Sequence, residues 1–162
     1  MGRKKARDVE ESLRVPRSKV FDVVDIDPDD TLELEGKSEA RRELKKLHEE
    51  LIDQQRMLYA QARNALLVVF QAIDTGGKDS TIRHVLGPLN PQGVRVSNFR
   101  APNTVELAHD YLWRIHREVP ARGMIGVFNR SHYEDVIAVR VHELAPKRDI
   151  ERRYTQINAF EK

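Results

Sequence analysis

The chain has 162 residues, 33% of them charged, yet its formal net charge is only +2. This length allows one domain of ordinary size with its own core, and the near-neutral balance argues against a dedicated nucleic-acid binder. The chain has no cysteine, which excludes disulfides, thiolate metal sites and thiol nucleophiles. The high charged fraction with little net charge argues for a soluble cytoplasmic protein. No apolar run approaches the ~20 residues that span a bilayer, so we expect no membrane partner.

The predicted elements begin after a basic, polar stretch. Residues 1–19 are expected to be a flexible tail, followed by a domain over residues 20–162. Apolar residues at helical spacing predict a long helix over residues 38–63, which packs on a sheet or on another subunit. A near-continuous apolar run predicts a strand over residues 64–73, covered on both faces.

Helical and strand patterns alternate through the rest of the chain. Further strands are predicted over residues 94–99 and 124–128, and further helices over residues 78–86, 104–119, 131–141 and 149–160. The helix over residues 104–119 is expected to turn Leu107, Tyr111, Leu112 and Ile115 inward. This alternation predicts an α/β fold with a parallel sheet and helices on both faces.

The first strand and the helix after it are joined by a phosphate-binding pattern. Residues 72–80 read Ala-Ile-Asp-Thr-Gly-Gly-Lys-Asp-Ser. The spacing fits G-x-x-x-x-G-K-[ST], although Ala72 replaces the first glycine and Asp79 replaces the hydroxyl residue. Backbone N–H groups and a helix N-terminus would cradle the anion, and the lysine would reach the outer phosphates. The predicted phosphate-binding residues in the loop are Thr75, Gly76, Gly77, Lys78, Asp79 and Ser80.

Two carboxylates in this loop need an explanation. Asp74 would repel phosphates unless a cation intervened, so it indicates Mg²⁺ or Mn²⁺, or a hydrogen bond to an acceptor group. The alternative is that Asp74 and Asp79 cap the following helix. For Asp79 both interpretations stay open.

Polar residues also follow the second and third predicted strands, where ligands of parallel sheets collect. Arg100 follows the second strand, and Asn129-Arg130-Ser131 follows the third. Arg130 can grip phosphate oxygens with its planar fork of donors. The alternative for Arg130 is an ion pair with Glu134 or Asp74. His132, two positions after Arg130, has no placed partner, so it is expected either to pack or to lie at the surface.

These residues carry a resemblance to a known family. Residues 71–82 resemble the Walker A segment of the second polyphosphate kinase family, the polyphosphate:nucleotide phosphotransferases, and residues 128–136 resemble its Walker B segment. Residues 90–93 and 112–116 are also similar to the family. Ala72 and Asn129 resemble the subgroup that phosphorylates AMP and ADP.

The resemblance implies a P-loop kinase fold similar to thymidylate kinase. It implies transfer of the terminal phosphoryl of inorganic polyphosphate to AMP or ADP with Mg²⁺ or Mn²⁺. Asp74, Lys78 and Arg130 would be the catalytic residues, with Asp74 as the metal ligand and Arg100 as a phosphate-binding residue that guides the polyanion. An ATP-dependent nucleotide kinase and a non-catalytic phosphate-binding module are the alternatives.

The family's pattern extends further than this sequence. The resemblance therefore implies the N-terminal part of a kinase domain, with the C-terminal strands and the basic helical lid missing. The first strand would then have an unpaired edge, which favours association. We accordingly expect a homo-oligomer.

Overall fold

The structure is a computed structural model that describes residues 11, 13–15, 22, 24, 26, 27, 29–31 and 34–162. The chain divides into two compact units, Met1–Lys46 and Leu47–Lys162, and the boundary falls inside the first long helix. The tail predicted over residues 1–19 lies outside the described residues, except for residues 11 and 13–15. The sheet and the candidate site belong to the second unit.

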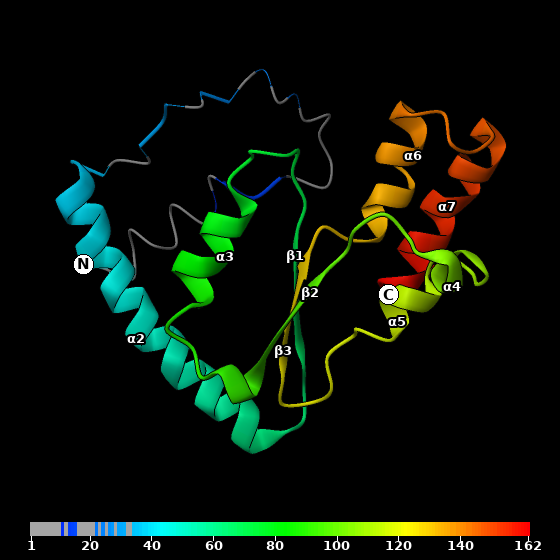
Figure 1. Cartoon of the computed structure of the whole chain (residues 1–162). Helices are drawn as coiled ribbons and strands as arrows, with labels where there is room; N and C mark the ends of the chain where they lie inside the picture. Colours follow the sequence, from blue (N-terminus) through cyan, green and yellow to red (C-terminus); the bar gives the residue numbers. More distant parts are fainter. Residues whose placement is uncertain are drawn as a thin grey trace. The chain divides into compact units, whose positions relative to one another are not determined.

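The sheet has three parallel strands in the order β1-β3-β2 (Figure 1). They are β1 (Leu66–Phe70), β2 (Val94–Asn98) and β3 (Ile125–Asn129). Because β3 pairs on both sides, Asn129 lies opposite both Phe70 and Asn98. The carboxyl ends of all three strands therefore meet at one edge of the sheet.

Helices cover both faces of this sheet, which confirms the predicted α/β class. In Figure 1, α3 lies on one side of the strands and α5 and α7 lie on the other. The helices and 3₁₀ turns are α2 (Lys37–Gln61), α3 (Lys78–Leu86), η2 (Pro91–Gly93), α4 (Thr104–Leu107), α5 (Trp113–His116), η3 (His132–Asp135), α6 (Ala138–Val141) and α7 (Lys147–Phe160).

The core forms around β3, whose side chains alternate between the two faces. Ile125 and Val127 are buried against apolar residues of α2 and α3. Phe128 is buried on the other face with Phe99 and Ile115, and the Phe99 and Phe128 rings meet edge to face with centroids 4.9 Å apart. The last strand in sequence is thus the central one in space.

The first strand is less covered than its sequence predicts. Leu66 is 46% exposed, and the other residues of β1 are only partly buried. Within the described residues, β1 pairs with β3 alone and so forms an edge of the sheet. Both faces of β1 are nevertheless in contact with the core, because Phe70 packs against the cluster around Val127 whereas Leu67 and Val69 pack against the cluster around Phe128. The predicted cover on both faces is therefore confirmed in part.

The predicted helix over residues 104–119 is broken into α4 and α5. The Asp110 carboxylate accepts a hydrogen bond from the backbone N–H of Leu112 at 2.9 Å, which forms a turn that competes with continuing the helix. As a result Leu107 is 68% exposed, which contradicts its predicted inward position. Ile115 is fully buried, as predicted.

The apolar stripe of α2 packs only in part. Leu51 and Leu58 contact the core cluster around β3, whereas Leu47 and Met57 are about half exposed. The buried polar residue of this helix is Gln55, which donates to the Asn90 carbonyl at 2.8 Å and accepts from the Asn90 N–H at 2.9 Å. These two bonds tie α2 to the turn that leads into β2.

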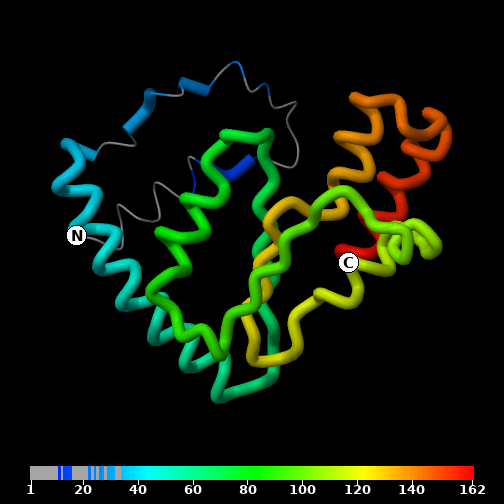
Figure 2. Tube along the Cα trace, viewed as in Figure 1, coloured from blue at the N-terminus to red at the C-terminus, as the bar shows by residue number. Residues whose placement is uncertain are grey.

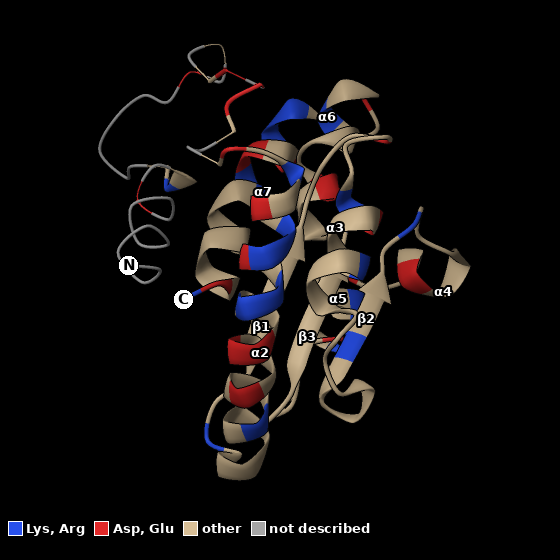
Figure 3. Ribbon diagram, turned by 90° about the vertical axis from the view of Figure 1, so that its left-hand side faces the viewer, with Lys and Arg blue, Asp and Glu red and all other residues tan. Residues whose placement is uncertain are grey.

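The chain end lies close to the sheet. Figure 2 shows the last turn of α7 beside α5, where the Phe160 and His116 rings meet with centroids 4.9 Å apart. Charged residues are concentrated on the helices, and among the strands only β2 carries one, Arg95 (Figure 3). No helix in the described part of the chain is long and apolar enough to cross a membrane.

Replacing Ile115 by alanine tests the packing of α5 on β3. The side chain is fully buried, so Ile115→Ala should lower the free energy of unfolding by about 2–5 kcal/mol through lost burial and a residual cavity. Leu107→Ala is the matched control from the same predicted helix, and it should change stability by less than about 0.5 kcal/mol. Urea unfolding followed by circular dichroism measures both. Equal losses in the two variants would contradict the observed break between α4 and α5.

Candidate active site

The turn between β1 and α3 has the backbone of an anion-binding loop. Thr75 and Gly77 adopt left-handed φ angles of 70° and 80°. A Cβ at Gly76 would lie 2.8 Å from the Ala72 Cβ and 3.0 Å from the Ile73 carbonyl oxygen, so only glycine fits there. This tight path leads directly to Lys78, the first residue of α3. The N-terminal N–H groups of a nine-residue helix thus face the loop.

The capping alternative for the two loop carboxylates is wrong. The N-cap of α3 is Gly77, which offers no side-chain oxygen, and the helix starts before Asp79. Hydroxyls act within this turn instead: Ser80 and Thr81 donate to the Gly77 carbonyl at 2.7 and 3.1 Å. Both carboxylates are therefore available for other partners.

Asp74 sits between two cations. The Lys78 side chain is only 8% exposed, and its Nζ lies 3.6 Å from Asp74 Oδ1. The Arg130 guanidinium donates a short hydrogen bond to the same oxygen. The Arg130 hydrogen bond and charge, and secondly the Lys78 charge, lower the pKa of Asp74 below its ordinary value. The ion pair foreseen as one alternative for Arg130 is thus present, with Asp74 rather than Glu134.

Asn129 links the ends of the strands. Its Nδ2 donates to Asp79 Oδ1 at 2.6 Å and to Asn98 Oδ1 at 2.8 Å. Its own Oδ1 is buried and has no hydrogen-bond partner among the described residues. Asp79, predicted as a phosphate contact, is therefore held by the third strand.

The donor set at this edge suits a hard divalent cation. The carboxylates of Asp74 and Asp79 and the unpartnered amide oxygen of Asn129 are all oxygen ligands. Among the described residues there is no cluster of three or more His, Cys, Asp or Glu side chains with metal-binding geometry. Mg²⁺ is usually held by one or two carboxylates together with substrate phosphates, so the residues present fit such an ion.

A hydrogen-bonded bridge that the sequence did not predict joins the loop to the segment after β3. Ser131 donates to Gln71 Oε1 at 3.0 Å, and Gln71 Nε2 donates to Glu134 at 2.6 Å. The Arg130 N–H donates to the Phe70 carbonyl at 3.0 Å, and Arg130 itself has a φ of 61°. These bonds hold Arg130 beside the loop. The sequence feature that could have indicated this bridge is Gln71, a polar residue directly after the apolar run of the first strand.

The segment after Arg130 is also fixed to the end of α7. His132 is fully buried, and its Nε2 lies 3.1 Å from Glu161 Oε1. The Tyr133 hydroxyl donates to the same carboxylate oxygen. Burial, with the Glu161 hydrogen bond, raises the pKa of Tyr133 to about 12, so its hydroxyl stays protonated at neutral pH. Of the two alternatives for His132, packing is thus the one observed, and its ring also contacts the Phe160 ring.

Arg100 is the predicted site residue that the structure does not connect to the loop. It follows β2 at the correct edge of the sheet, and its carbonyl accepts a hydrogen bond from Arg114 at 2.8 Å. Its side chain is exposed and makes no ion pair with any described residue. The structure does bring together three of the predicted residues, Asp74, Lys78 and Arg130. Asp79 is held at the same edge of the sheet by its hydrogen bond from Asn129.

Comparison with known proteins gives a consistent result. The family model described as polyphosphate kinase 2 (PPK2) matches residues 34–162. An AMP/ADP-polyphosphate phosphotransferase of Meiothermus ruber is 49% identical over 143 residues, covering 88% of this chain and 54% of the relative. An ADP-polyphosphate phosphotransferase of Rhodopseudomonas palustris is 57% identical over 94 residues, covering 58% of this chain and 32% of the relative.

Solved structures agree with the sequence relatives. A crystal structure of polyphosphate kinase 2 from Arthrobacter aurescens matches with a TM-score of 0.87 and 41% identity, over 94% of this chain and 55% of that one. The chain thus spans about half the length of the first of these relatives and of this solved chain. Because the family model covers residues 34–162 and the fold and loop geometry agree with it, this chain belongs to the polyphosphate kinase 2 family.

Proposed function

We propose that this protein transfers the terminal phosphoryl group of inorganic polyphosphate to AMP or ADP, with Mg²⁺ or Mn²⁺. The convergence of Lys78 and Arg130 on the loop carboxylate Asp74 carries the proposal. The substrates come from the names of relatives that are 49% and 57% identical to this chain. Phosphoryl transfer needs positioning and charge neutralisation more than covalent chemistry, and this cluster offers both.

Each residue has a role that follows from its charge and surroundings. The loop amides, Lys78 and Arg130 neutralise oxygens of the transferring group, because fixed cations in a site are aligned before the charge develops. The bridge from Gln71 to Ser131 and Glu134 keeps the Arg130 fork aligned. Asp74 and Asp79 would hold the metal ion, which when bound would neutralise the phosphate charge that these carboxylates otherwise repel.

The contact between Asp74 and the two cations supports an exchange of partners, in which a metal ion would replace Lys78 and Arg130 at the carboxylate. With Asp74 as their shared partner, Lys78 and Arg130 are partly neutralised by one negative charge. A divalent cation on the carboxylate would release both side chains toward phosphate oxygens. The resting ion pair keeps Lys78 in place while its side chain is largely removed from water.

A coupled assay tests the activity. The chain, and a chimera in which residues 34–162 replace the matching segment of the Meiothermus ruber relative, are incubated with AMP or ADP, Mg²⁺ and either polyphosphate or ATP. We expect product with polyphosphate and none when EDTA is added. Product with ATP alone would instead identify an ATP-dependent nucleotide kinase. Ligand-dependent stabilisation without product in either protein would identify a non-catalytic binding module.

Lys78→Ala tests the role of the loop lysine in the active protein of that assay. Loss of a charge that stabilises the transition state should lower kcat by about 100- to 1,000-fold. Lys147→Ala is the matched control, because Lys147 is also the first residue of a helix but is exposed. Steady-state kinetics compare the two variants. Wild-type kcat in Lys78→Ala would refute the assignment.

Arg130→Lys separates the charge of Arg130 from its geometry. A lysine keeps the charge but loses the planar fork, so we expect kcat to fall by about 10- to 100-fold, equivalent to the loss of one charged hydrogen bond. Arg140→Lys, on the exposed surface of α6, should leave kcat unchanged. Initial rates at saturating polyphosphate measure the difference. An unchanged rate in Arg130→Lys would mean that Arg130 acts only as the partner of Asp74.

A further inference from the structure

The turn that follows Arg130 carries two carboxylates, Glu134 and Asp135, which both lie in η3. Its backbone is tight, because the Glu134 N–H donates to the Ser131 carbonyl at 3.1 Å and the Ser131 hydroxyl accepts from the Tyr133 N–H. Glu134 follows Arg130 by four positions. Four residues span at most about 14 Å even when fully extended, and a turn is shorter, so these two long side chains can reach each other.

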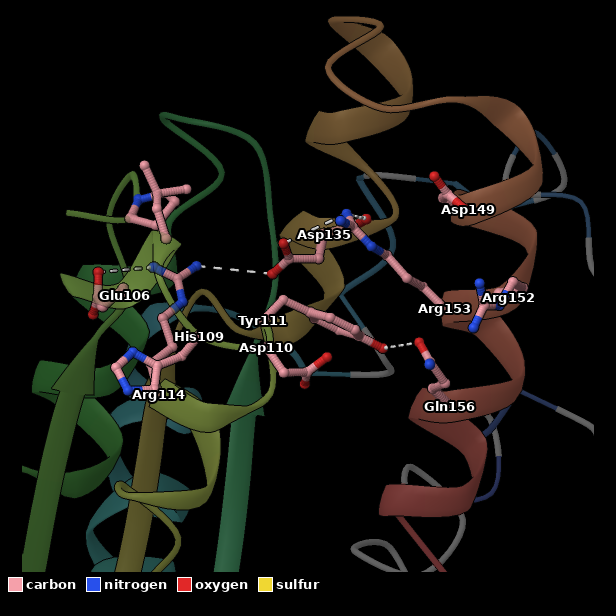
Figure 4. A pocket seen from close by; sticks show the side chains of 12 residues that line it. Glu106, His109, Asp110, Tyr111, Arg114, Asp135, Asp149, Arg152, Arg153 and Gln156 are labelled. Carbon is pink, nitrogen blue, oxygen red and sulfur yellow. Dashed lines mark hydrogen bonds and ion pairs between the residues drawn. The ribbon is translucent and has the colours of Figure 1, made fainter. Parts of the chain in front are cut away.

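Asp135 is paired with cations from two other elements. Its carboxylate lies 3.8 Å from Arg114 and 3.7 Å from Arg153. It lines a cavity of about 380 Å³ between the segment that contains α4 and α5 and one side of α7, and Figure 4 shows it between the two guanidinium groups. Asp135 therefore does not compete for Arg130.

Glu134 is held by a neutral group instead. Its Oε1 accepts a hydrogen bond from Gln71 Nε2 at 2.6 Å, and its half-buried side chain makes no ion pair with any described residue. A hydrogen bond from an amide satisfies a carboxylate oxygen but leaves the negative charge in place. The turn after β3 thus contains one carboxylate whose charge no described cation neutralises.

The Gln71 amide can hold Glu134 because the orientation of the amide is fixed. Its Oε1 accepts from the Ser131 hydroxyl at 3.0 Å, which leaves Nε2 to face Glu134. Ser131 is fully buried and so offers its hydroxyl from a defined position. Position 71 therefore needs a side chain that accepts a hydrogen bond at one atom and donates at another.

The exchange of partners at Asp74 gives this restraint a consequence. In the structure Arg130 donates to Asp74, and a metal ion on that carboxylate would free the guanidinium. The freed cation would then have two anions to choose from, a phosphate oxygen and Glu134. Because Glu134 belongs to the same short turn, little loop-closure entropy would oppose an Arg130–Glu134 pair. Such a pair would remove Arg130 from the phosphate.

We propose that Gln71 is a positioning residue that holds Glu134 away from Arg130, so that the arginine released by Asp74 binds phosphate and not a second carboxylate. The inference deepens the proposed function and rests on it, because it assumes that Arg130 binds a phosphate oxygen. Gln71 then has two roles: it fixes the turn after β3, and it removes a competing anion.

A double-mutant cycle between Gln71 and Glu134 separates these two roles. Calorimetry measures the affinity of the whole chain for tripolyphosphate in excess Mg²⁺. Gln71→Met keeps the side-chain length and loses both hydrogen bonds, so it should weaken binding by about 10- to 100-fold, the effect of one charged hydrogen bond. Adding Glu134→Gln to this variant should restore the affinity to within about threefold of wild type, since the competing charge is gone. Glu134→Gln alone should change the affinity by less than about threefold.

The alternatives to this competition give different results in the same cycle. If Gln71 only fixed the turn, the double variant would bind no more tightly than Gln71→Met. If Glu134 acted only as a general negative charge, Glu134→Gln would strengthen binding equally with and without Gln71. Either result would overturn the proposal, as would unchanged binding in Gln71→Met or a wild-type chain that does not bind tripolyphosphate.

Two further variants complete the test. Gln54→Met replaces an exposed glutamine on α2, so it is the matched control and should leave the affinity unchanged. Gln71→Asn keeps the amide but is one methylene shorter, and it takes the place of Gln71→Met in the cycle if circular dichroism shows that Gln71→Met does not fold. The two proposals can fail separately: the expected cycle without phosphoryl transfer refutes the activity alone, and transfer without coupling in the cycle refutes the role of Gln71 alone.

Discussion

The parallel pairing of β3 with both of its neighbours is the constraint on which the site depends. It brings Asn129 level with Phe70 and Asn98, so the three strand ends meet at one edge. Asn129 then bonds to Asn98 and Asp79, and the Arg130 N–H extends the ladder to the Phe70 carbonyl. A shift of this register by one residue would turn Asn129 to the opposite face and separate Arg130 from the loop.

The charged side chains at this edge of the sheet pair with one another. Asp74 is exposed and pairs with Arg130 and with the largely buried Lys78, so two cations meet one carboxylate. A site with unpaired buried cations would be costly to maintain. The loop carboxylate reduces that cost, and the bonds from Gln71 and Glu161 to the segment after β3 keep the arrangement rigid. The same residues thus lower the electrostatic cost of burying a cation and supply the positive charges that would bind an anion.

Local patterns predicted some features well and others poorly. The start and end of α3 and the tight turn before it follow from glycines and a lysine that are neighbours in sequence, and these predictions hold. The broken helix at Asp110 was missed because a side-chain turn overrode the apolar spacing. The unpaired edge of β1 was expected from the family resemblance, whereas the apolar run by itself did not predict the partial exposure of the strand, because exposure depends on neighbouring elements. Asp79 was left open between a cap and a ligand; the helix start at Lys78, with Gly77 as its N-cap, decided against the cap, and Asn129, fifty positions away, is the partner of Asp79.

The sequence alone determined the α/β order of elements, the phosphate loop and the resemblance to polyphosphate kinases, because each of these depends on residues close together in the chain. The tertiary structure alone decided that the last strand is central, that Arg130 pairs with Asp74 across 56 positions, and that Asp135 lines a cavity with α7. The physical reason is that strand order and long-range ion pairs arise from packing, which no local spacing specifies.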